Sequence, residues 1–337
     1  MRKAIYIGGV RIKPGERLIA NIPVVRLYTH AEMTMPAHVI HSKQEGPRLF
    51  VSAAVHGDEI IGVEIIHRLL KLKALKRLRG TLIAIPVVNV YGFIQQSRYV
   101  PDRRDLNRFF PGSDKGSFTS RLADIFMKEV VANSTHGIDL HAGSNHRINF
   151  PHIRAYLDNA ETELLARAFG VPVVLNADLR DGSLRQAVME KGIPILVYEA
   201  GEALRFDEIA IRAGVKGIVS VMRAIGMLPR ATVKGRRIKP LIARSSTWAR
   251  APASGIVRTK IPLGGKVSKG SKIAEVADPF GENVVDVLSP ASGIVIGRLN
   301  LPLVHRGDAL VHIACFDESP SVKATIEVFQ EEFNQKF

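Results

Sequence analysis

The chain has 337 residues, of which 46% are hydrophobic, 23% are charged and one, Cys315, is a cysteine. This apolar content is enough for a sizeable core and excludes a disordered chain. The lone cysteine excludes intramolecular disulfides and cysteine-rich zinc modules, so any metal site must use histidine and carboxylate ligands. No segment reaches the roughly 18 apolar residues of a membrane span, and the N-terminus does not match a signal peptide. We therefore expect a cytoplasmic protein with no membrane partner.

The formal net charge of +15 raises the question of a nucleic-acid partner. The densest basic clusters lie at residues 67–80 and 233–244, and neither contains interleaved aromatic side chains. Aromatic residues make up only 6% of the chain, which is few for a surface that stacks on bases. We therefore interpret both clusters as solvent-exposed basic faces and predict no nucleic-acid partner.

Short β segments are expected over residues 1–45, and an alternation of strands and helices follows. Runs rich in apolar and β-branched residues predict strands at 48–55, 81–92 and 192–202, and 136–143 is expected to be a strand that ends in polar residues. Apolar residues at helical spacing predict helices at 59–78, 117–134, 162–170 and 206–226. This alternation predicts an open α/β sheet, and such sheets bind ligands at the carboxyl ends of their strands.

Three candidate metal ligands follow two of these strands. His56 and Glu59 come just after the first predicted strand, and His141 lies at the end of the third. Two histidines and one glutamate leave the fourth position of a tetrahedral zinc ion open, which is the arrangement of a catalytic site. Asp139 lies two residues before His141 and so on the same side of the strand, where it could fix the histidine tautomer. The alternative is that His141 is a strand-end histidine with a structural role.

Four motifs occur in the order "HGDE", "RYVPDRRDLNRFFPG", "DLHAG" and "YEAGE". Together they resemble the aspartoacylase and succinylglutamate desuccinylase family, zinc deacylases with the zinc-carboxypeptidase fold, over roughly residues 45–225. The resemblance implies an open mixed sheet with helices on both faces, in a catalytic domain that we place at residues 1–230. It also implies one zinc ion per chain, held by His56, Glu59 and His141.

The same resemblance assigns the remaining site residues. Glu199 matches the general base, Asn107 and Arg108 match the pair that holds the substrate carboxylate, and Arg98 matches the arginine that polarises the scissile carbonyl. Two alternatives stay open, since Arg104 could replace Arg98 and Glu202 competes with Glu199. His146, Arg147, His152 and Arg154 are expected in a loop after the third ligand and are given no role.

Amide hydrolysis needs residues of these types. Zinc lowers the pKa of bound water to about 7, and a glutamate can take the water's proton and return it to the departing amine. A cation near the metal stabilises the oxyanion, and a guanidinium binds a carboxylate through two parallel hydrogen bonds. We therefore expect a zinc-dependent deacylase for a small N-acyl amino acid or related amine, with N-acetyl-diaminobutyrate as a first substrate to test. A zinc carboxypeptidase and a non-catalytic binding protein are the alternatives.

The C-terminal part contains an internal repeat, because "PASGIV" occurs at 252–257 and again at 290–295. Two such half-motifs resemble the barrel-sandwich of biotinyl and lipoyl carrier domains. We therefore predict a linker at 231–246 and an all-β domain with a C-terminal tail at 247–337. Residues 277–287 connect the half-motifs and contain no lysine, so the domain is expected to be unmodified. It would restrict entry to the active site or support a homo-oligomer.

Overall fold

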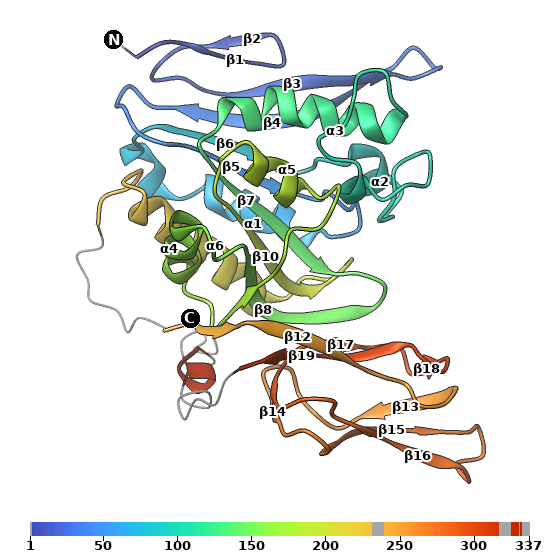
Figure 1. The fold of residues 1–337 in the computed structure, drawn as a ribbon. Helices are drawn as coiled ribbons and strands as arrows, with labels where there is room; N and C mark the ends of the chain where they lie inside the picture. Colours follow the sequence, from blue (N-terminus) through green and yellow to red (C-terminus); the bar gives the residue numbers. More distant parts are fainter. Residues whose placement is uncertain (1, 231–238, 317–324, 330, 332–337) are drawn as a thin grey trace.

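The computed structural model describes residues 2–230, 239–316, 325–329 and 331 (Figure 1). Its centre is a large mixed sheet of 13 strands within this described part of the chain. The middle of the sheet is parallel and consists of β6 (Thr81–Ile85), β5 (Arg48–Ala53), β7 (His136–Gly143) and β10 (Ile195–Glu202), in that order. These strands are the four that the sequence predicts, and their side chains are almost entirely buried on both faces.

Helices cover both faces of this sheet. On one face lie α1 (Ile61–Leu70), α4 (Ala160–Phe169) and α6 (Glu208–Ala224), whose apolar side chains form one core with the sheet. On the other face lie α3 (Phe118–Glu129) and α5 (Leu184–Glu190), which share a second core with the N-terminal strands. Short 3₁₀ helices occur at η1 (Lys73–Arg77), η2 (Leu106–Arg108) and η3 (Val131–Asn133).

Two predicted elements are shorter than expected. The helix predicted over 59–78 ends at Leu70, because Leu72 takes an extended conformation that separates α1 from η1. The strand predicted over 81–92 ends at Ile85. Asn89 then caps α2 (Val90–Ile94), because its side chain accepts a hydrogen bond from the Gly92 amide.

The loop expected after His141 is in fact a strand. β8 (Arg147–Ala155) pairs antiparallel with β10, and β9 (Val173–Asn176) pairs parallel with β8. Pro151 in the middle of the segment argues against a strand, since proline lacks an amide donor. The pairing shifts at this point, from Glu199 opposite His152 to Gly201 opposite Asn149, and the irregularity accommodates the proline.

The N-terminal segment forms four strands, in the region where short β segments are expected. β1 (Ile5–Ile7) and β2 (Val10–Ile12) form a hairpin of their own. β3 (Arg17–Arg26) and β4 (Glu32–His41) extend the large sheet beyond β6, with β4 antiparallel to β6. They share an apolar core with α3, and β5 and β6 separate them from β7, which carries His141.

The described C-terminal residues up to 316 are all-β, and they are not separate from the catalytic sheet. β17 (Gly293–Leu299) pairs with β8, and β19 (Ala309–Cys315) and β12 (Ser245–Arg250) follow it in the same sheet. A second sheet contains β16 (Val284–Leu288), β15 (Lys272–Ala277), β13 (Gly255–Thr259) and β18 (Leu303–Val304). An apolar core lies between the two sheets, at the end of the molecule opposite β1 and β2 (Figure 1).

The internal repeat is visible in the strand pairing. β14 (Lys266–Val267), from the first half-motif, pairs with β17 of the second half, and β18 from the second pairs with β13 of the first. Each half therefore contributes its short strand to the sheet of the other. The likeness to carrier domains itself stays a prediction.

The predicted linker at 231–246 needs a correction at its C-terminal end. Residues 231–238 lie outside the described residues, but β11 (Leu241–Ala243) pairs parallel with β9, and β12 begins at Ser245. The exposed edge of β9 supplies hydrogen-bond partners for this segment, which its sequence does not reveal. Within the described residues, no helix has the length and apolarity that a membrane span requires.

Candidate metal centre and active site

The candidate ligands come from the carboxyl ends of two neighbouring parallel strands. His56 and Glu59 lie in the connection between β5 and α1, and His141 lies near the end of β7. Gly57 lets this connection pass close to the backbone of Gly92, because a Cβ atom at residue 57 would lie 2.0 Å from the Gly92 carbonyl carbon. The sequence argument for a shared sheet edge is therefore confirmed in the structure.

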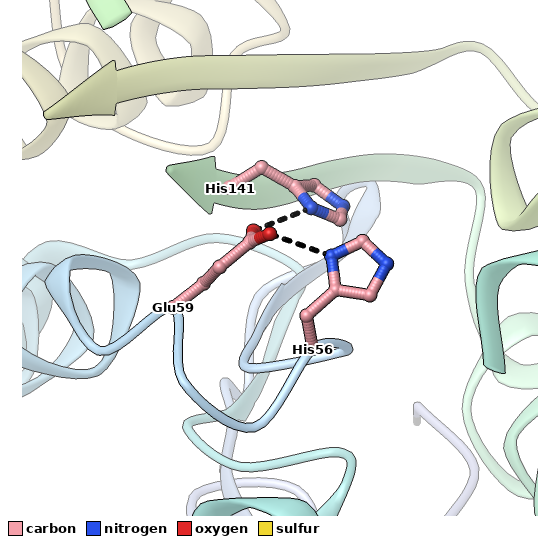
Figure 2. Close-up of side chains that lie close together, drawn as sticks. All are labelled: His56, Glu59 and His141. Atoms are coloured by element: carbon pink, nitrogen blue, oxygen red, sulfur yellow. Dashed lines mark hydrogen bonds and ion pairs between the residues drawn. The ribbon is translucent and has the colours of Figure 1, made fainter. Parts of the chain in front are cut away.

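The three side chains point toward one another (Figure 2). The Glu59 carboxylate lies 2.7 Å from His56 Nδ1 through Oε1 and 2.8 Å from His141 Nδ1 through Oε2. One ligand atom from each residue lies within 4.8 Å of the others, and all three residues are buried. Among the described residues this is the one His, Cys, Asp and Glu group that could hold a metal ion.

Each histidine is oriented by a carboxylate on its other ring nitrogen. Asp139 Oδ2 lies 2.6 Å from His141 Nε2, and the Ser52 hydroxyl donates to the second Asp139 oxygen at 2.7 Å. Asp105 Oδ1 lies 3.1 Å from His56 Nε2. The position of Asp139 agrees with the sequence interpretation, whereas the role of Asp105 was missed. Asp105 opens the "DLNR" segment, and its carboxylate next to the Asn-Arg pair is the signal that could have found it.

Opposite charges compensate one another in this buried cluster. Burial alone would raise the pKa of Glu59, but His56 and His141 hold it well below its usual value. Burial alone would lower the pKa of His141, but Asp139 and Glu59 raise it well above the usual value. The cluster therefore carries charge in the protein interior, which requires close partners of the opposite sign.

The donor set fits a divalent zinc ion. Two imidazole nitrogens and one carboxylate are the ligands of several catalytic zinc sites. Because both Nε2 atoms are bonded to carboxylates, both Nδ1 atoms are directed at the same point as the Glu59 carboxylate. A zinc ion would be held by His56 Nδ1, His141 Nδ1 and a Glu59 oxygen.

Glu199 lies beside the candidate ligands. It is the register partner of His141 in the parallel pairing of β10 with β7, and it lines the same pocket. The Asn149 amide donates a hydrogen bond to Glu199 Oε2 at 2.9 Å. Burial raises the Glu199 pKa above the usual value, although His141 and Arg154 oppose the shift. The competing residue, Glu202, instead accepts a hydrogen bond from Asn300.

Arg98 contacts the cluster, and Arg104 does not lie with it. The Arg98 guanidinium donates to Glu59 Oε1 at 3.2 Å and to Asp105 Oδ2 at 2.8 Å. Arg104 is half-exposed, and its guanidinium lies 5.3 Å from the centre of the Phe109 ring. Of the two arginines that the sequence left open, the structure therefore places Arg98 in the pocket.

Asn107 and Arg108 line the pocket from η2. The Asn107 side-chain oxygen accepts a hydrogen bond from the Leu184 amide at 2.8 Å, which ties η2 to the start of α5. Gly182 makes this close packing possible, because its φ is +72° and a Cβ atom would lie 2.3 Å from the Arg108 carbonyl oxygen. The Arg108 side chain is left partly exposed to the pocket.

The pocket has a volume of about 520 Å³. Its lining includes residues that sequence reasoning left without a role. From β8 come Arg147, Asn149, His152 and Arg154, and from α5 comes Arg185. From the C-terminal strands come Ser246, Trp248, Arg250 and His312. The Trp248 and His312 rings are stacked, with centroids 4.4 Å apart, so the C-terminal strands form one wall of the site.

A buried His-Glu-His cluster at the carboxyl ends of parallel strands, with a glutamate beside it, is typical of metal-dependent hydrolases. The comparison with protein families agrees with this class. Residues 45–225, more than half of the chain, match the succinylglutamate desuccinylase/aspartoacylase catalytic domain. The chain belongs to this family.

The similarity to known proteins extends beyond the catalytic domain. An N-alpha-acetyl-L-2,4-diaminobutyric acid deacetylase of Halomonas elongata is 26% identical over 302 residues, which is 85% of this chain and 86% of that protein. The product-bound ectoine utilization protein EutE (DoeB) of Ruegeria pomeroyi has a TM-score of 0.80 at 24% identity, over 94% of this chain and 96% of that chain. A succinylglutamate desuccinylase/aspartoacylase of Rhodobacter sphaeroides has a TM-score of 0.79 at 24% identity, over 89% and 96%. The two structures establish the shared fold.

Proposed function

We propose that this protein is a zinc-dependent deacylase that hydrolyses the amide bond of a small N-acyl amino acid. The observation that carries the proposal is the meeting of three features in one pocket: the His-Glu-His cluster, the Glu199 carboxylate and the Arg108 guanidinium. Membership in the desuccinylase/aspartoacylase family supports this reaction class. The name of the Halomonas elongata relative supports deacylation of an N-acyl amino acid.

Proton transfer is assigned to Glu199. When bound, zinc would supply a water nucleophile at neutral pH, because it lowers the pKa of the water that it binds to about 7. Glu199 would accept a proton at its carboxylate and pass it to the departing amine nitrogen. Its raised pKa suits this exchange, because a carboxylate whose pKa lies closer to neutral both accepts and returns a proton. Asn149 would hold the carboxylate in place through Oε2.

Two arginines are assigned to bind negatively charged groups of the substrate. The ion pairs with Glu59 and Asp105 hold Arg98 beside the cluster, where its guanidinium would stabilise the negative charge that develops on the carbonyl oxygen. Arg108 would bind the substrate carboxylate through its guanidinium, which also donates to the Asn107 carbonyl and whose ion-pair partner among the described residues, Asp105, lies 4.0 Å away. Asn107, in the same turn, would bind the substrate carboxylate together with Arg108.

The proposal is tested on the purified full-length chain loaded with zinc. Amine release is measured from a panel of N-acetyl and N-succinyl amino acids, and release of C-terminal amino acids from short peptides is measured in parallel. We expect hydrolysis of N-acyl amino acids, and a loss of turnover of about 10²-fold or more in Glu199→Gln with zinc content unchanged. Glu202→Gln is the matched control and should retain turnover.

Hydrolysis of peptides in place of N-acyl amino acids would favour a carboxypeptidase. Substrate binding without any hydrolysis would favour a binding protein. Loss of turnover in Glu202→Gln together with normal turnover in Glu199→Gln would transfer the general-base role to Glu202.

A further inference from the structure

One face of the outer C-terminal sheet is apolar and exposed. The strands of this sheet follow in the order β16, β15, β13 and β18, at the end of the molecule opposite β1 and β2 (Figure 1). Its inner face contributes Val257, Val276 and Val304 to the core shared with β12, β17 and β19. Because side chains alternate along a strand, the neighbours of these valines point to the opposite face, away from that core.

An apolar stripe crosses this outward face from one edge strand to the other. Val284 of β16 pairs with Ala277 of β15, which pairs with Ile256 of β13. Ile256 in turn pairs with Leu303 of β18. Leu303 is 73% exposed and Val284 is 51% exposed, and the two residues between them are partly exposed. Scattered exposed apolar residues are ordinary on a protein surface, but a contiguous stripe indicates a surface that binds another molecule.

A row of charged residues runs beside the stripe, two residues further along each strand. Asp286 of β16 pairs with Glu275 of β15, and Glu275 pairs with Arg258 of β13, which is exposed. Lys272 contacts both acids, and Lys260, directly after β13, contacts Glu275. Both lysines contact Oε2 of Glu275, so among the described residues its Oε1 is left for a further donor. The row is therefore negative over β16 and β15 and positive over β13.

The stripe and the charged row are both self-complementary about a two-fold axis. An axis parallel to the strands, between β15 and β13, places β15 of one copy over β13 of the other, and β16 over β18. Residues at the same level along the strands then face each other, so stripe covers stripe and Glu275 of each copy faces Arg258 of the other. Packed sheets lie about 10 Å apart, a distance that these two long side chains span together.

We propose that this face binds a second copy of the chain and forms a two-fold symmetric dimer. The occupant is the same chain because one surface carries both halves of the charge match, as an isologous interface requires. Trp248 and His312, which line the pocket, belong to the inner sheet. Pairing through the outer sheet should therefore leave hydrolysis unchanged.

The face is small, so the dimer should be weak. Four strands about 4.8 Å apart, with about five residues of about 3.3 Å each, span roughly 300 Å². A standard interface buries about 800 Å² per partner. Leu301 and Phe280, exposed in the turns next to β18 and β15, add to the apolar area. We therefore expect a Kd in the micromolar range, and a fraction of dimer that rises with protein concentration.

Sedimentation velocity of the full zinc-loaded chain over a range of concentrations tests the proposal. The wild-type chain should pass from monomer to dimer as its concentration rises. Leu303→Asp places a charge within the stripe and should keep the chain monomeric, while circular dichroism shows an unchanged fold because Leu303 is exposed. Ile19→Asp is the matched control, since Ile19 is 61% exposed on β3, and this variant should dimerise normally.

Two charge variants test the two-fold arrangement itself. Arg258→Glu sets acidic side chains opposite one another in the dimer, and Glu275→Lys sets basic ones opposite one another. Each variant alone should therefore weaken dimerisation by about tenfold or more. An equimolar mixture of the two variants should restore dimers, because every contact across the interface then joins opposite charges. If Glu275→Lys does not fold, Arg258→Glu and Leu303→Asp still decide the outcome.

A wild-type chain that stays monomeric at every concentration would overturn the proposal. So would dimers that persist in both Leu303→Asp and Arg258→Glu, because the interface would then lie elsewhere. Folded charge variants that stay monomeric after mixing would reject the two-fold contact between Glu275 and Arg258. All these variants should hydrolyse substrate as the wild type does, so a failure of the proposed reaction leaves this test unaffected.

Discussion

The Asn149 amide donates a hydrogen bond to the Glu199 carboxylate at 2.9 Å, across the antiparallel pairing of β8 with β10. A donor to a carboxylate stabilises its charged form. Burial already raises the Glu199 pKa, and removing this donor should raise it further. If ionised Glu199 is the base, activity falls as the pH drops through this pKa.

We therefore expect Asn149→Ala to shift the acidic limb of the kcat/KM profile to higher pH and to lower turnover at neutral pH. Asn300→Ala is the control, because it removes the equivalent bond to Glu202 at 2.7 Å. A pH profile that is unchanged in Asn149→Ala, or shifted equally in Asn300→Ala, would count against Glu199 as the titrating base.

Removing a candidate ligand should remove the metal. His56→Ala and His141→Ala each leave two of the three proposed ligands, so we expect strong loss of zinc by elemental analysis while circular dichroism shows a retained fold. His67→Ala is the control, since His67 is exposed on α1 and bonded to Glu64. Full zinc content in both ligand variants would place the metal elsewhere.

Asp105 is expected to tune the metal site without being a ligand. Burial would raise the pKa of Asp105, but His56 and Arg98 lower it, so the carboxylate is ionised when it orients them. Asp105→Asn should weaken zinc affinity by about 10- to 100-fold while zinc still binds at saturation. Competition with a chelator measures the affinity. Asp102→Asn, whose side chain bonds to Thr119, is the control and should bind zinc normally.

Arg108 should be sensitive even to a change that keeps its charge. Arg108→Lys replaces a planar fork with a single ammonium, so KM for N-acyl amino acids should rise. Analogues that lack the carboxylate should be affected much less. Equal losses for both kinds of substrate would show that Arg108 does not bind the carboxylate. Arg104→Lys serves as the control, because Arg104 lies over Phe109.

The C-terminal wall should limit substrate size. Trp248 lines the pocket and stacks on His312, so Trp248→Ala would remove a large side chain from that wall. We expect higher relative activity on long acyl groups than on acetyl groups, measured as a ratio of kcat/KM values. Phe280→Ala changes an exposed residue between β15 and β16 and should leave the ratio unchanged. An unchanged ratio in Trp248→Ala would mean that other residues set the limit.

The sequence by itself determined the parallel centre of the sheet and the candidate ligands. Strands buried on both faces favour continuous apolar runs, and β5 and the first half of β10 have them, whereas β7 was expected from its place in the alternation of strands and helices. Because parallel strands end at the same edge, His56, Glu59 and His141 could be brought together from their positions at the ends of predicted strands, and their meeting is confirmed. The motif order was enough to identify the family.

Only the tertiary structure decided what surrounds that centre. The sequence does not reveal β8, because Pro151 interrupts its pattern. Without β8, the placement of Asn149, His152 and Arg154 in the pocket could not be predicted either. The C-terminal strands were expected as a separate domain, yet β17 pairs with β8 and brings Trp248 and His312 into the wall. Periodicity reports which face of a segment is buried, but not which distant segment covers it. Sheet pairing joins residues through backbone hydrogen bonds that are almost independent of side-chain identity, so the sequence carries little signal for it.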